Sequence, residues 1–277
     1  MEGLSPSTPV VAGRLQGKTA IVTGATQGLG EDIARHLYAC GAAVTLAGRS
    51  KAQGEAIARD LGERALFVET DVESDEQIIR CIERTRARFG GLDILVNNAC
   101  TYDDAGIESS RAQWHHTLGV NLISAAIFAQ QASARMGRDA VIVNIGSTGG
   151  KFGAAGRAIY PASKAAMLQL TRSLAVALAP QGIRCLSVSP AWTWSPSMRD
   201  MAGGDLAFAD RVGARFHPLG RVGRGEEIAA VVAFACSAEA SWISGVDLPV
   251  DGGFTCLGPD QGRSPREWFA AARAATD

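Results

Sequence analysis

Residues 18–30 read KTAIVTGATQGLG, and residues 31–41 continue as EDIARHLYACG. The first run is β-branched, the second has helical spacing of apolar residues, and a turn containing Gly24, Gly28 and Gly30 joins them. Glycines at this place let backbone amides approach a pyrophosphate at the positive end of a helix. Tight turns use glycine for other reasons too. The position between a first strand and its helix nevertheless favours phosphate binding.

The same alternation of short β-branched runs and longer amphipathic segments continues along the chain. Parallel strands need long right-handed crossovers, so this order predicts an α/β fold. We expect a single-domain, Rossmann-like, doubly wound parallel sheet of about seven strands with helices on both faces. The predicted strands are 18–23, 43–47, 65–69, 94–98, 141–145, 184–189 and 246–250.

A length of 277 residues fits one continuous core. We expect a flexible segment at 1–14, a Rossmann-like catalytic domain at 15–255, and a tail at 256–277 that reaches a subunit interface, closes over a pocket or frays. Within the domain, 192–216 interrupts the alternation and is the predicted substrate loop. Its Trp192, Trp194 and Met198 could line an apolar pocket, although core packing explains each of them equally well.

Charge and cysteine content limit the kinds of partner. Lys and Arg number 27 against 28 Asp and Glu, so the net charge of -1 gives no field for binding nucleic acid or an anionic membrane. The six cysteines show no CxxC or metal-ligand spacing, and we expect no metal. A basic start followed by an apolar run is also missing, which predicts a cytoplasmic protein.

Further motifs follow the glycine turn in a fixed order. They are TGATQGLG at 23–30 with TGxxxGxG spacing, Asp71-Val72, Asn97-Asn98-Ala99, Asn121, Ser147, Tyr160 and Lys164. In this order and spacing the chain resembles the short-chain dehydrogenase/reductase family, from about Leu15 to Gly253. The resemblance implies a nicotinamide-dependent oxidoreductase with Asn121, Ser147, Tyr160 and Lys164 as its catalytic residues.

Tyr160 and Lys164 are four residues apart and should share one helix face. Bringing a tyrosine pKa from about 10 to near 7 requires about 4 kcal/mol of selective phenolate stabilisation. A cation at about 4 Å supplies about that much at an effective dielectric of 20, and the oxidised nicotinamide adds to it. We therefore expect Tyr160 to be the general acid and base, with Ser147 holding the substrate oxygen. The resemblance implies that Lys164 also binds the nicotinamide ribose and that Asn121 supports a water path.

The end of the second strand predicts the cofactor. Gly48 stands where an acidic residue would bind both ribose hydroxyls, and Arg49 follows it and could clamp a 2'-phosphate. We expect NADP(H), with NAD(H) as the alternative if Arg49 is only a solvated charge. The predicted cofactor contacts are Gly24, Thr26, Gln27, Gly28, Leu29, Gly30, Arg49, Asp71, Val72, Asn98, Ala99, Tyr160, Lys164, Pro190, Ala191, Thr193 and Ser195.

Three positions depart from the family's pattern. Cys100 follows NNA where glycine is common, Gly146 precedes Ser147, and Ala191 follows Pro190 where glycine is expected. Each departure leaves the catalytic groups in place. Ala191 matters most, since its methyl group restricts the backbone that should lie against the nicotinamide.

The expected reaction interconverts a small ketone or aldehyde and its alcohol, with predicted substrate contacts at Ser147, Gly149, Trp192, Trp194 and Met198. Reduction of a 3-oxoacyl thioester on a carrier protein is the alternative. Gln181 weakens it, because carrier-linked reductases of this family usually have arginine there. A non-catalytic cofactor-binding protein is disfavoured by the intact tetrad. Dehydration or epimerisation would need a further acid or base, for which Glu108, His115 and His116 form no specific constellation.

The helix expected at 163–179 is apolar around more of its circumference than packing on one sheet requires. A second copy could cover the excess. The family resemblance implies a homotetramer, or a homodimer, in which these helices meet across a two-fold axis.

Overall fold

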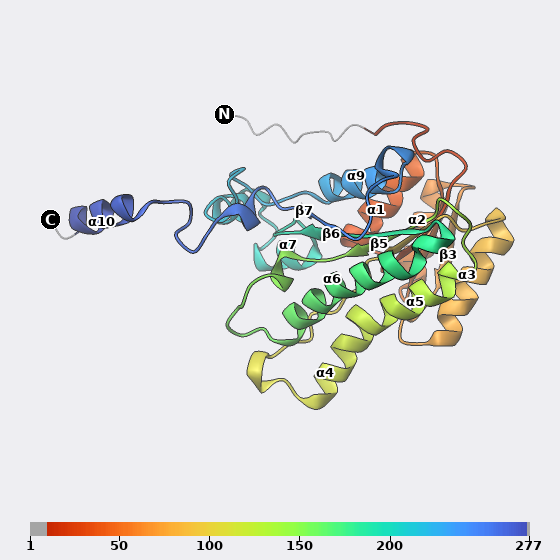
Figure 1. The fold of residues 1–277 in the computed structure, drawn as a ribbon, viewed down its shortest axis with the longest axis horizontal. Helices are drawn as coiled ribbons and strands as arrows, with labels where there is room; N and C mark the ends of the chain where they lie inside the picture. The colour runs from red at the N-terminus through yellow and green to blue at the C-terminus, as the bar shows by residue number, and fades with distance from the viewer. Residues whose placement is uncertain (1–9, 276–277) are drawn as a thin grey trace.

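A computed structural model describes residues 10–275 and contains the predicted α/β fold, a parallel sheet in the order β3-β2-β1-β4-β5-β6-β7 (Figure 1). The strand bounds differ from the predicted ones by a residue at most. They are β1 (Thr19–Thr23), β2 (Ala43–Gly48), β3 (Ala65–Glu69), β4 (Ile94–Asn97), β5 (Val141–Ile145), β6 (Arg184–Pro190) and β7 (Asp247–Val250).

The order of the strands reverses between β1 and β4. The chain builds outward from β1 to β2 and β3, and then crosses back to place β4 on the other side of β1, where Ile21 pairs with Leu95. At such a reversal the connections leave in opposite directions, and a crevice opens at the carboxyl ends of the strands. The glycine turn after β1 and the NNA segment after β4 therefore meet at one edge of the sheet.

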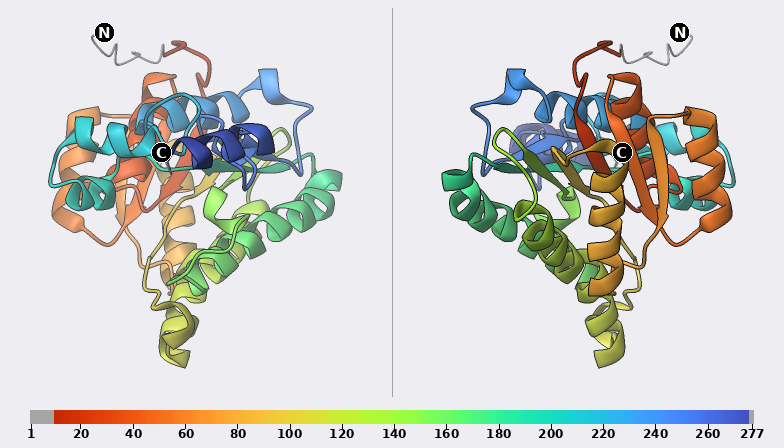
Figure 2. Two further views of the ribbon diagram at one scale, coloured as in Figure 1. Left: turned by 90° about the vertical axis from the view of Figure 1, so that its left-hand side faces the viewer. Right: turned by 90° about the vertical axis from the view of Figure 1, so that its right-hand side faces the viewer.

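Helices cover both faces of the sheet, and the side chains of β1 alternate between the two cores that result. Ala20 and Val22 join the cluster beneath α1 (Gly28–Ala39), α2 (Lys51–Leu61) and α9 (Gly225–Ala235). Ile21 joins the opposite cluster, beneath α3 (Asp75–Phe89), α5 (Ser124–Ser133) and α6 (Ile159–Leu178). Figure 2 shows these two helix layers on either side of the sheet.

The predicted substrate loop at 192–216 is not a continuous loop. It contains α7 (Pro196–Met201) and α8 (Leu206–Gly213), capped by the side chains of Ser195 and Asp205. Across the sheet edge, α4 (Arg111–Leu118) runs through a single π-helical turn, Gly119–Ile123, into α5. Short 3-10 turns occur at Gly106–Glu108, Thr148–Gly150, Ala179–Gln181, Ala238–Ala240 and Phe254–Cys256.

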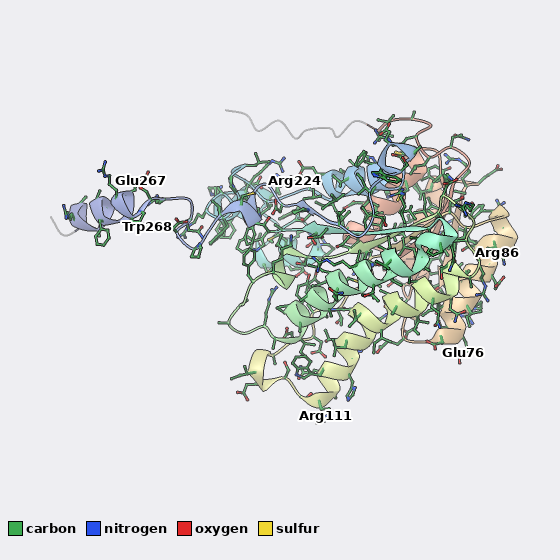
Figure 3. All side chains as sticks on the ribbon, viewed as in Figure 1. Glu76, Arg86, Arg111, Arg224, Glu267 and Trp268 are labelled. Atoms are coloured by element: carbon green, nitrogen blue, oxygen red, sulfur yellow. The ribbon has the colours of Figure 1, made fainter. Side chains whose placement is uncertain are left out.

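The first and last of the described residues lie outside the sheet. Of the predicted flexible segment at 1–14, residues 1–9 lie outside the described residues, and Arg14 forms a 3.1 Å ion pair with Glu239. At the other end, α10 (Pro265–Ala274) extends away from the body, and all of its residues are exposed (Figures 1 and 3). Trp268, labelled in Figure 3, is 44% exposed and Phe269 is 70% exposed.

A partly buried carboxylate lies where α1 packs on α9. Asp32 contacts the first residue of α9, Gly225, so closely that a Cβ there would overlap its carboxylate. Burial raises the pKa of Asp32 to about 6, and repulsion from Glu226 and Glu31 adds to the effect while Arg35 opposes it. The folded protein therefore binds a proton here more tightly than the unfolded chain, whose ordinary value is 3.8.

Replacing Asp32 with asparagine should stabilise the protein at pH 7.5 by about 1 kcal/mol, discounted for partial exposure. The sign follows from the raised pKa. Above pH 6 the wild-type carboxylate is charged and unfavourable, and this cost is relieved as the pH falls through 6 toward 3.8. Urea unfolding at pH 7.5 and pH 5 should show the advantage of the variant narrowing at the lower pH. The exposed Glu63→Gln is the control. A variant no more stable than wild type at pH 7.5 would contradict this account.

Candidate active site

The turn between β1 and α1 is built from glycine because other residues do not fit. Gly24 and Gly28 have φ values of 65° and 53°, in the left-handed region. A Cβ at Gly24 would lie 2.9 Å from the Ala99 Cα, and one at Gly30 would overlap the Gly24 carbonyl oxygen. The turn therefore brings bare backbone, and the first amides of α1, to the surface of the crevice.

This turn forms one wall of a cavity of about 430 Å³ at the reversal point of the sheet. Many of the predicted cofactor contacts line it: Gly24, Thr26, Gln27, Gly28, Leu29, Gly30, Arg49, Asp71, Val72, Asn98, Ala99 and Ser195. The remaining predicted contacts, Tyr160, Lys164, Pro190, Ala191 and Thr193, lie outside that lining. Lining residues outside the predicted contacts are Gly48, Ser50, Thr70, Cys100, Thr101, Tyr102, His116, Val120, Pro196 and Ser197.

The walls of the cavity are tied together by polar contacts across the reversal point. The Asn98 side-chain amide donates to the Thr23 carbonyl oxygen at 2.9 Å, and the Thr23 hydroxyl accepts from the backbone N–H groups of Asn98 and Ala99 at 2.9 and 3.0 Å. The ends of β1 and β4 are thus fixed to each other. Asn98 holds the backbone of the glycine turn in place.

Gly48 ends β2 beside this turn. A Cβ at Gly48 would approach the Thr26 Cγ2 to 2.9 Å, so Thr26 occupies the space that a side chain at 48 would need. Arg49 and Ser50 follow at the rim, where both are exposed and line the cavity. Gly48 thus occupies the position of the acidic residue, and a cationic and a hydroxyl side chain follow it at the rim.

Tyr160 and Lys164 lie in the first turns of α6, and both are buried. The Lys164 Nζ lies 5.8 Å from the centroid of the Tyr160 ring, so the two side chains share one helix face as predicted. Lys164 donates to the Ile145 carbonyl oxygen at 2.8 Å, which anchors it to the end of β5. Cys100 links the pair to the cavity, because it lines the cavity and the Lys164 amine lowers the pKa of its thiol against the effect of burial.

Ser147 follows β5 and reaches the same tyrosine. Its hydroxyl accepts from the Gly149 N–H at 3.0 Å and hydrogen-bonds with Tyr160. The unusual Gly146 before it has a steric reason, since a Cβ there would overlap the hydroxyls of Ser187 and Ser189.

Asn121 lies in the π-helical turn between α4 and α5, a feature that often marks functional sites. Its side chain bonds both ways with Thr101, accepting from the N–H at 2.8 Å and donating to the carbonyl oxygen at 3.0 Å. It also donates to Ser163 Oγ at 3.2 Å, beside Lys164 in the chain. All four predicted catalytic residues are thus drawn to one region between β4, β5 and α6.

Burial raises the pKa of Tyr160 to about 12, with charge repulsion from Cys100 adding to it. Hydrogen bonds from Ser147 and Tyr102 and the charge of Arg157 lower it, without overcoming the desolvation. Tuning of the Tyr160 pKa by Lys164 together with the oxidised nicotinamide therefore stays a prediction. Lys164 donates to the Ile145 carbonyl oxygen, and the charge of an oxidised nicotinamide would add to that of its amine.

The predicted substrate contacts are spread over the neighbouring loops. Gly149 lies beside the Tyr160 ring, where a Cβ would be 3.5 Å from the ring, in ordinary van der Waals contact. The backbone N–H of Trp194 donates to the Gly223 carbonyl oxygen at 2.9 Å, and that of Met198 donates to Ser195 Oγ at 3.3 Å. Trp192 belongs to a row of rings that sequence did not predict. Consecutive centroids lie 5.0 to 6.0 Å apart in the order Phe216, Trp192, His217, Phe254, Phe152.

Residues 10–275 contain neither a candidate metal site nor a candidate membrane span. Within residues 10–275, His, Cys, Asp and Glu side chains form no group of three or more that could hold a metal ion. In the same range, every helix is too short or too polar to cross a bilayer.

Comparison with known proteins gives concordant matches. A protein-family model described as enoyl-(acyl carrier protein) reductase matches residues 24–255. The cis-4-hydroxycyclohexanecarboxylate dehydrogenase of Sinomonas cyclohexanicum is 35% identical over 246 residues, covering 87% of this chain and 97% of that protein. The 3-oxoacyl-[acyl-carrier-protein] reductase of Aquifex aeolicus is 36% identical over 250 residues, covering 87% and 98%. A short-chain dehydrogenase/reductase structure from Brucella melitensis superposes with a TM-score of 0.81 at 32% identity, covering 87% and 98%.

Proposed function

We propose, from the premise that this chain belongs to the short-chain dehydrogenase/reductase family, that it interconverts a small ketone or aldehyde and the corresponding alcohol. As a member it is an oxidoreductase that acts on CH–OH groups with a nicotinamide dinucleotide. One observation carries the finer proposal. Tyr160 and Lys164 share a buried helix face, and beside them lies a cavity whose glycine turn exposes its backbone.

The cavity fits a dinucleotide. Its glycine turn leaves no room for a Cβ, and it ends at a helix N-terminus, which together suit a pyrophosphate. When bound, the nicotinamide carries the hydride and, when oxidised, a positive charge. Tyr160 then gives its hydroxyl proton to the carbonyl oxygen, or takes it from the alcohol, while Ser147 donates a hydrogen bond to that oxygen. Lys164 is proposed to hold the nicotinamide ribose, and Asn121 to connect Lys164 to solvent.

NADP(H) is the proposed preference, because Arg49 lies at the cavity rim after Gly48. Replacing Arg49 with alanine should raise the Kd for NADPH about 10-fold, since a charged hydrogen bond to phosphate contributes about 1.5 kcal/mol or more. The Kd for NADH should change less than about twofold. Fluorescence of the reduced cofactor measures both, and the exposed Arg59→Ala is the matched control. Equal losses for the two cofactors would contradict the assignment of Arg49 to the 2'-phosphate.

A free carbonyl compound is favoured over a carrier-bound thioester. The exposed turn before β6 carries Gln181. Two arginines between α5 and β5, Arg135 and Arg138, could also contribute positive charge, but Arg135 is already paired with Glu83 at 2.5 Å. The positive patch that would hold an acidic carrier protein is thereby weakened. The row of aromatic rings around Trp192 suits an alcohol on an apolar ring instead, and the Sinomonas relative is named for a cyclohexane-ring alcohol that also bears a carboxylate.

The proposal is tested by a panel of secondary alcohols, ketones and aldehydes, including cyclohexanols and their 4-carboxylates, assayed with NADP(H) and NAD(H). A 3-oxoacyl thioester, free and carrier-bound, is included as the competing substrate. We expect kcat/KM to be highest for a free alcohol or ketone. A higher value for the carrier-bound thioester would favour the reductase alternative. Cofactor binding without turnover of any compound would favour the non-catalytic one.

A homotetramer, or a homodimer, is also proposed. Apolar side chains stand exposed on α6 and near β7, where Val176 is 78%, Trp242 100% and Val246 41% exposed. Another copy of the chain would cover them through an isologous contact. Sedimentation velocity measures the assembly directly.

A further inference from the structure

The loop between β4 and the Gly106–Glu108 turn crosses the start of α6, the helix that carries Tyr160. The first turn of any helix has N–H groups without intrahelical partners. The N-cap of α6 is Ala158, whose side chain has no oxygen to accept from them. Pro161 has no N–H, so the unpaired donors belong to the residues just before it.

Asp104 of this loop supplies the missing acceptor. Its carboxylate accepts from the N–H groups of Ala158 at 3.0 Å and Tyr160 at 2.8 Å, and from that of Gly106 at 2.9 Å. Burial alone would raise the pKa of Asp104, but the bonds from Ala158, Tyr160 and Gly106 hold it below its ordinary value. A charged carboxylate thus caps a 20-residue helix from outside and binds the backbone of Tyr160 itself.

Tyr102, two residues earlier, contacts the side chain of the same tyrosine. The two rings stack with centroids 4.9 Å apart and planes 28° from parallel. The interaction of the two hydroxyls lowers the pKa of Tyr160 and raises that of Tyr102, and Tyr102 also lines the cofactor cavity. Tyr102 therefore limits the rotation of the Tyr160 ring on one side, at the edge of the site.

The loop that carries both residues is itself fixed. Asn121 bonds both ways with Thr101, and the Thr117 hydroxyl donates to the Asp103 carbonyl oxygen at 2.7 Å. The loop therefore transmits the position of the α4–α5 junction to the start of α6.

We propose that Tyr102 and Asp104 are positioning residues for Tyr160: Asp104 fixes its backbone, and Tyr102 orients its ring and donates a hydrogen bond to its hydroxyl. The inference rests on the proposed function, since it assigns the proton transfer to Tyr160. Neither residue needs to touch the substrate.

The first test replaces Asp104 with alanine and with asparagine, which keeps one acceptor oxygen. A displacement of about 1 Å can cost about 100-fold in rate, so a partly freed Tyr160 should cost about 10-fold in kcat in Asp104→Ala and less in Asp104→Asn. KM and the Kd for NADPH should stay within about twofold. Asp103→Asn is the matched control. The exposed Asp103 carboxylate accepts a hydrogen bond from the Gln113 side-chain amide at 2.9 Å, a contact that does not involve α6.

Two results would overturn the role of Asp104. One is an unchanged kcat in both variants. The other is a fall in kcat matched by an equal loss of cofactor affinity, which indicates general damage to the fold. If Asp104→Ala does not fold, Asp104→Asn decides between the same outcomes.

The second test is Tyr102→Phe, which keeps the stacked ring and removes the hydroxyl. Alcohol oxidation needs the Tyr160 phenolate, and losing a donor to it raises the pKa of that group. In the pH profile of kcat for alcohol oxidation, the acidic limb should therefore move to higher pH by about one unit. The other groups facing Tyr160 are Ser147, Cys100, Lys164 and Arg157, and all of them remain. Tyr38→Phe is the control, and an unmoved limb would overturn the role of Tyr102.

Titration of tyrosine absorbance with NADP+ present keeps this test independent of turnover. The chain has three tyrosines, so Tyr160 is isolated by subtracting the curve of Tyr160→Phe from wild type and that of the double variant Tyr102→Phe/Tyr160→Phe from Tyr102→Phe. Its midpoint should lie higher in Tyr102→Phe than in wild type. An unchanged midpoint counts against the inference even in an active enzyme. A raised midpoint with no turnover of any panel compound counts against the proposed function alone.

Discussion

Tyr160→Phe is expected to lower kcat by about 100- to 10,000-fold, the range that general acid–base catalysis contributes. Phenylalanine keeps the ring that stacks on Tyr102 and removes only the group that exchanges the proton. The Kd for NADPH should remain within about threefold, because Tyr160 lies outside the lining of the cofactor cavity. Steady-state rates in both directions and cofactor fluorescence measure the two quantities on one preparation.

Tyr38→Phe is the matched control for this loss, since Tyr38 contacts Arg64 at the surface of α1, with the guanidinium 3.9 Å from its ring centroid. It should leave kcat within about twofold. Retained turnover in Tyr160→Phe would remove the proton transfer from this residue, and Ser147 or a water held by Lys164 would then have to carry it. Loss of cofactor binding in the variant would instead show that Tyr160 acts on the fold of the site.

The sheet could be predicted because its inner strands are buried on both faces, and all seven strands read as short, largely apolar runs between turn residues. The predicted 43–47 became Ala43–Gly48, and 141–145 was matched in full. The segment at 192–216 was predicted as a loop because its apolar residues follow no clear period. Its helices begin at local capping signals that were in the sequence, Ser195 before Pro196 and Asp205 before Leu206.

The catalytic pair was predictable because four residues along a helix return to the same face. Contacts that depend on tertiary structure were not. Asp104 reaches α6 across 54 to 56 residues of chain, and only the missing acceptor at Ala158 hints that a partner must come from elsewhere. The pKa of Tyr160 was also beyond sequence. It depends on how far burial outweighs the interactions with Ser147, Tyr102 and Arg157, which the tertiary structure brings to the ring.

Gly30→Ala is expected to reduce the affinity for NADPH by about 10- to 100-fold and to destabilise the fold by about 1–3 kcal/mol. The added methyl group would overlap the Gly24 carbonyl oxygen and approach the Asn98 side-chain nitrogen to 2.5 Å. Both belong to the contact that holds the glycine turn against the end of β4, where Asn98 donates to Thr23 at 2.9 Å. Relief of the overlap must therefore move the backbone that faces the pyrophosphate.

Gly137→Ala separates this local effect from the general cost of losing a glycine. Gly137 is exposed, and a Cβ added there would meet no atom within 4 Å. That control should bind NADPH like wild type. Calorimetric unfolding and cofactor titration of both variants distinguish two origins of a loss at Gly30. If the turn is only a tight connection, stability will fall while the affinity of the folded protein is kept. If its backbone forms the pyrophosphate site, affinity will fall even where the variant is fully folded, since the methyl group displaces the surface on which the phosphates are proposed to lie.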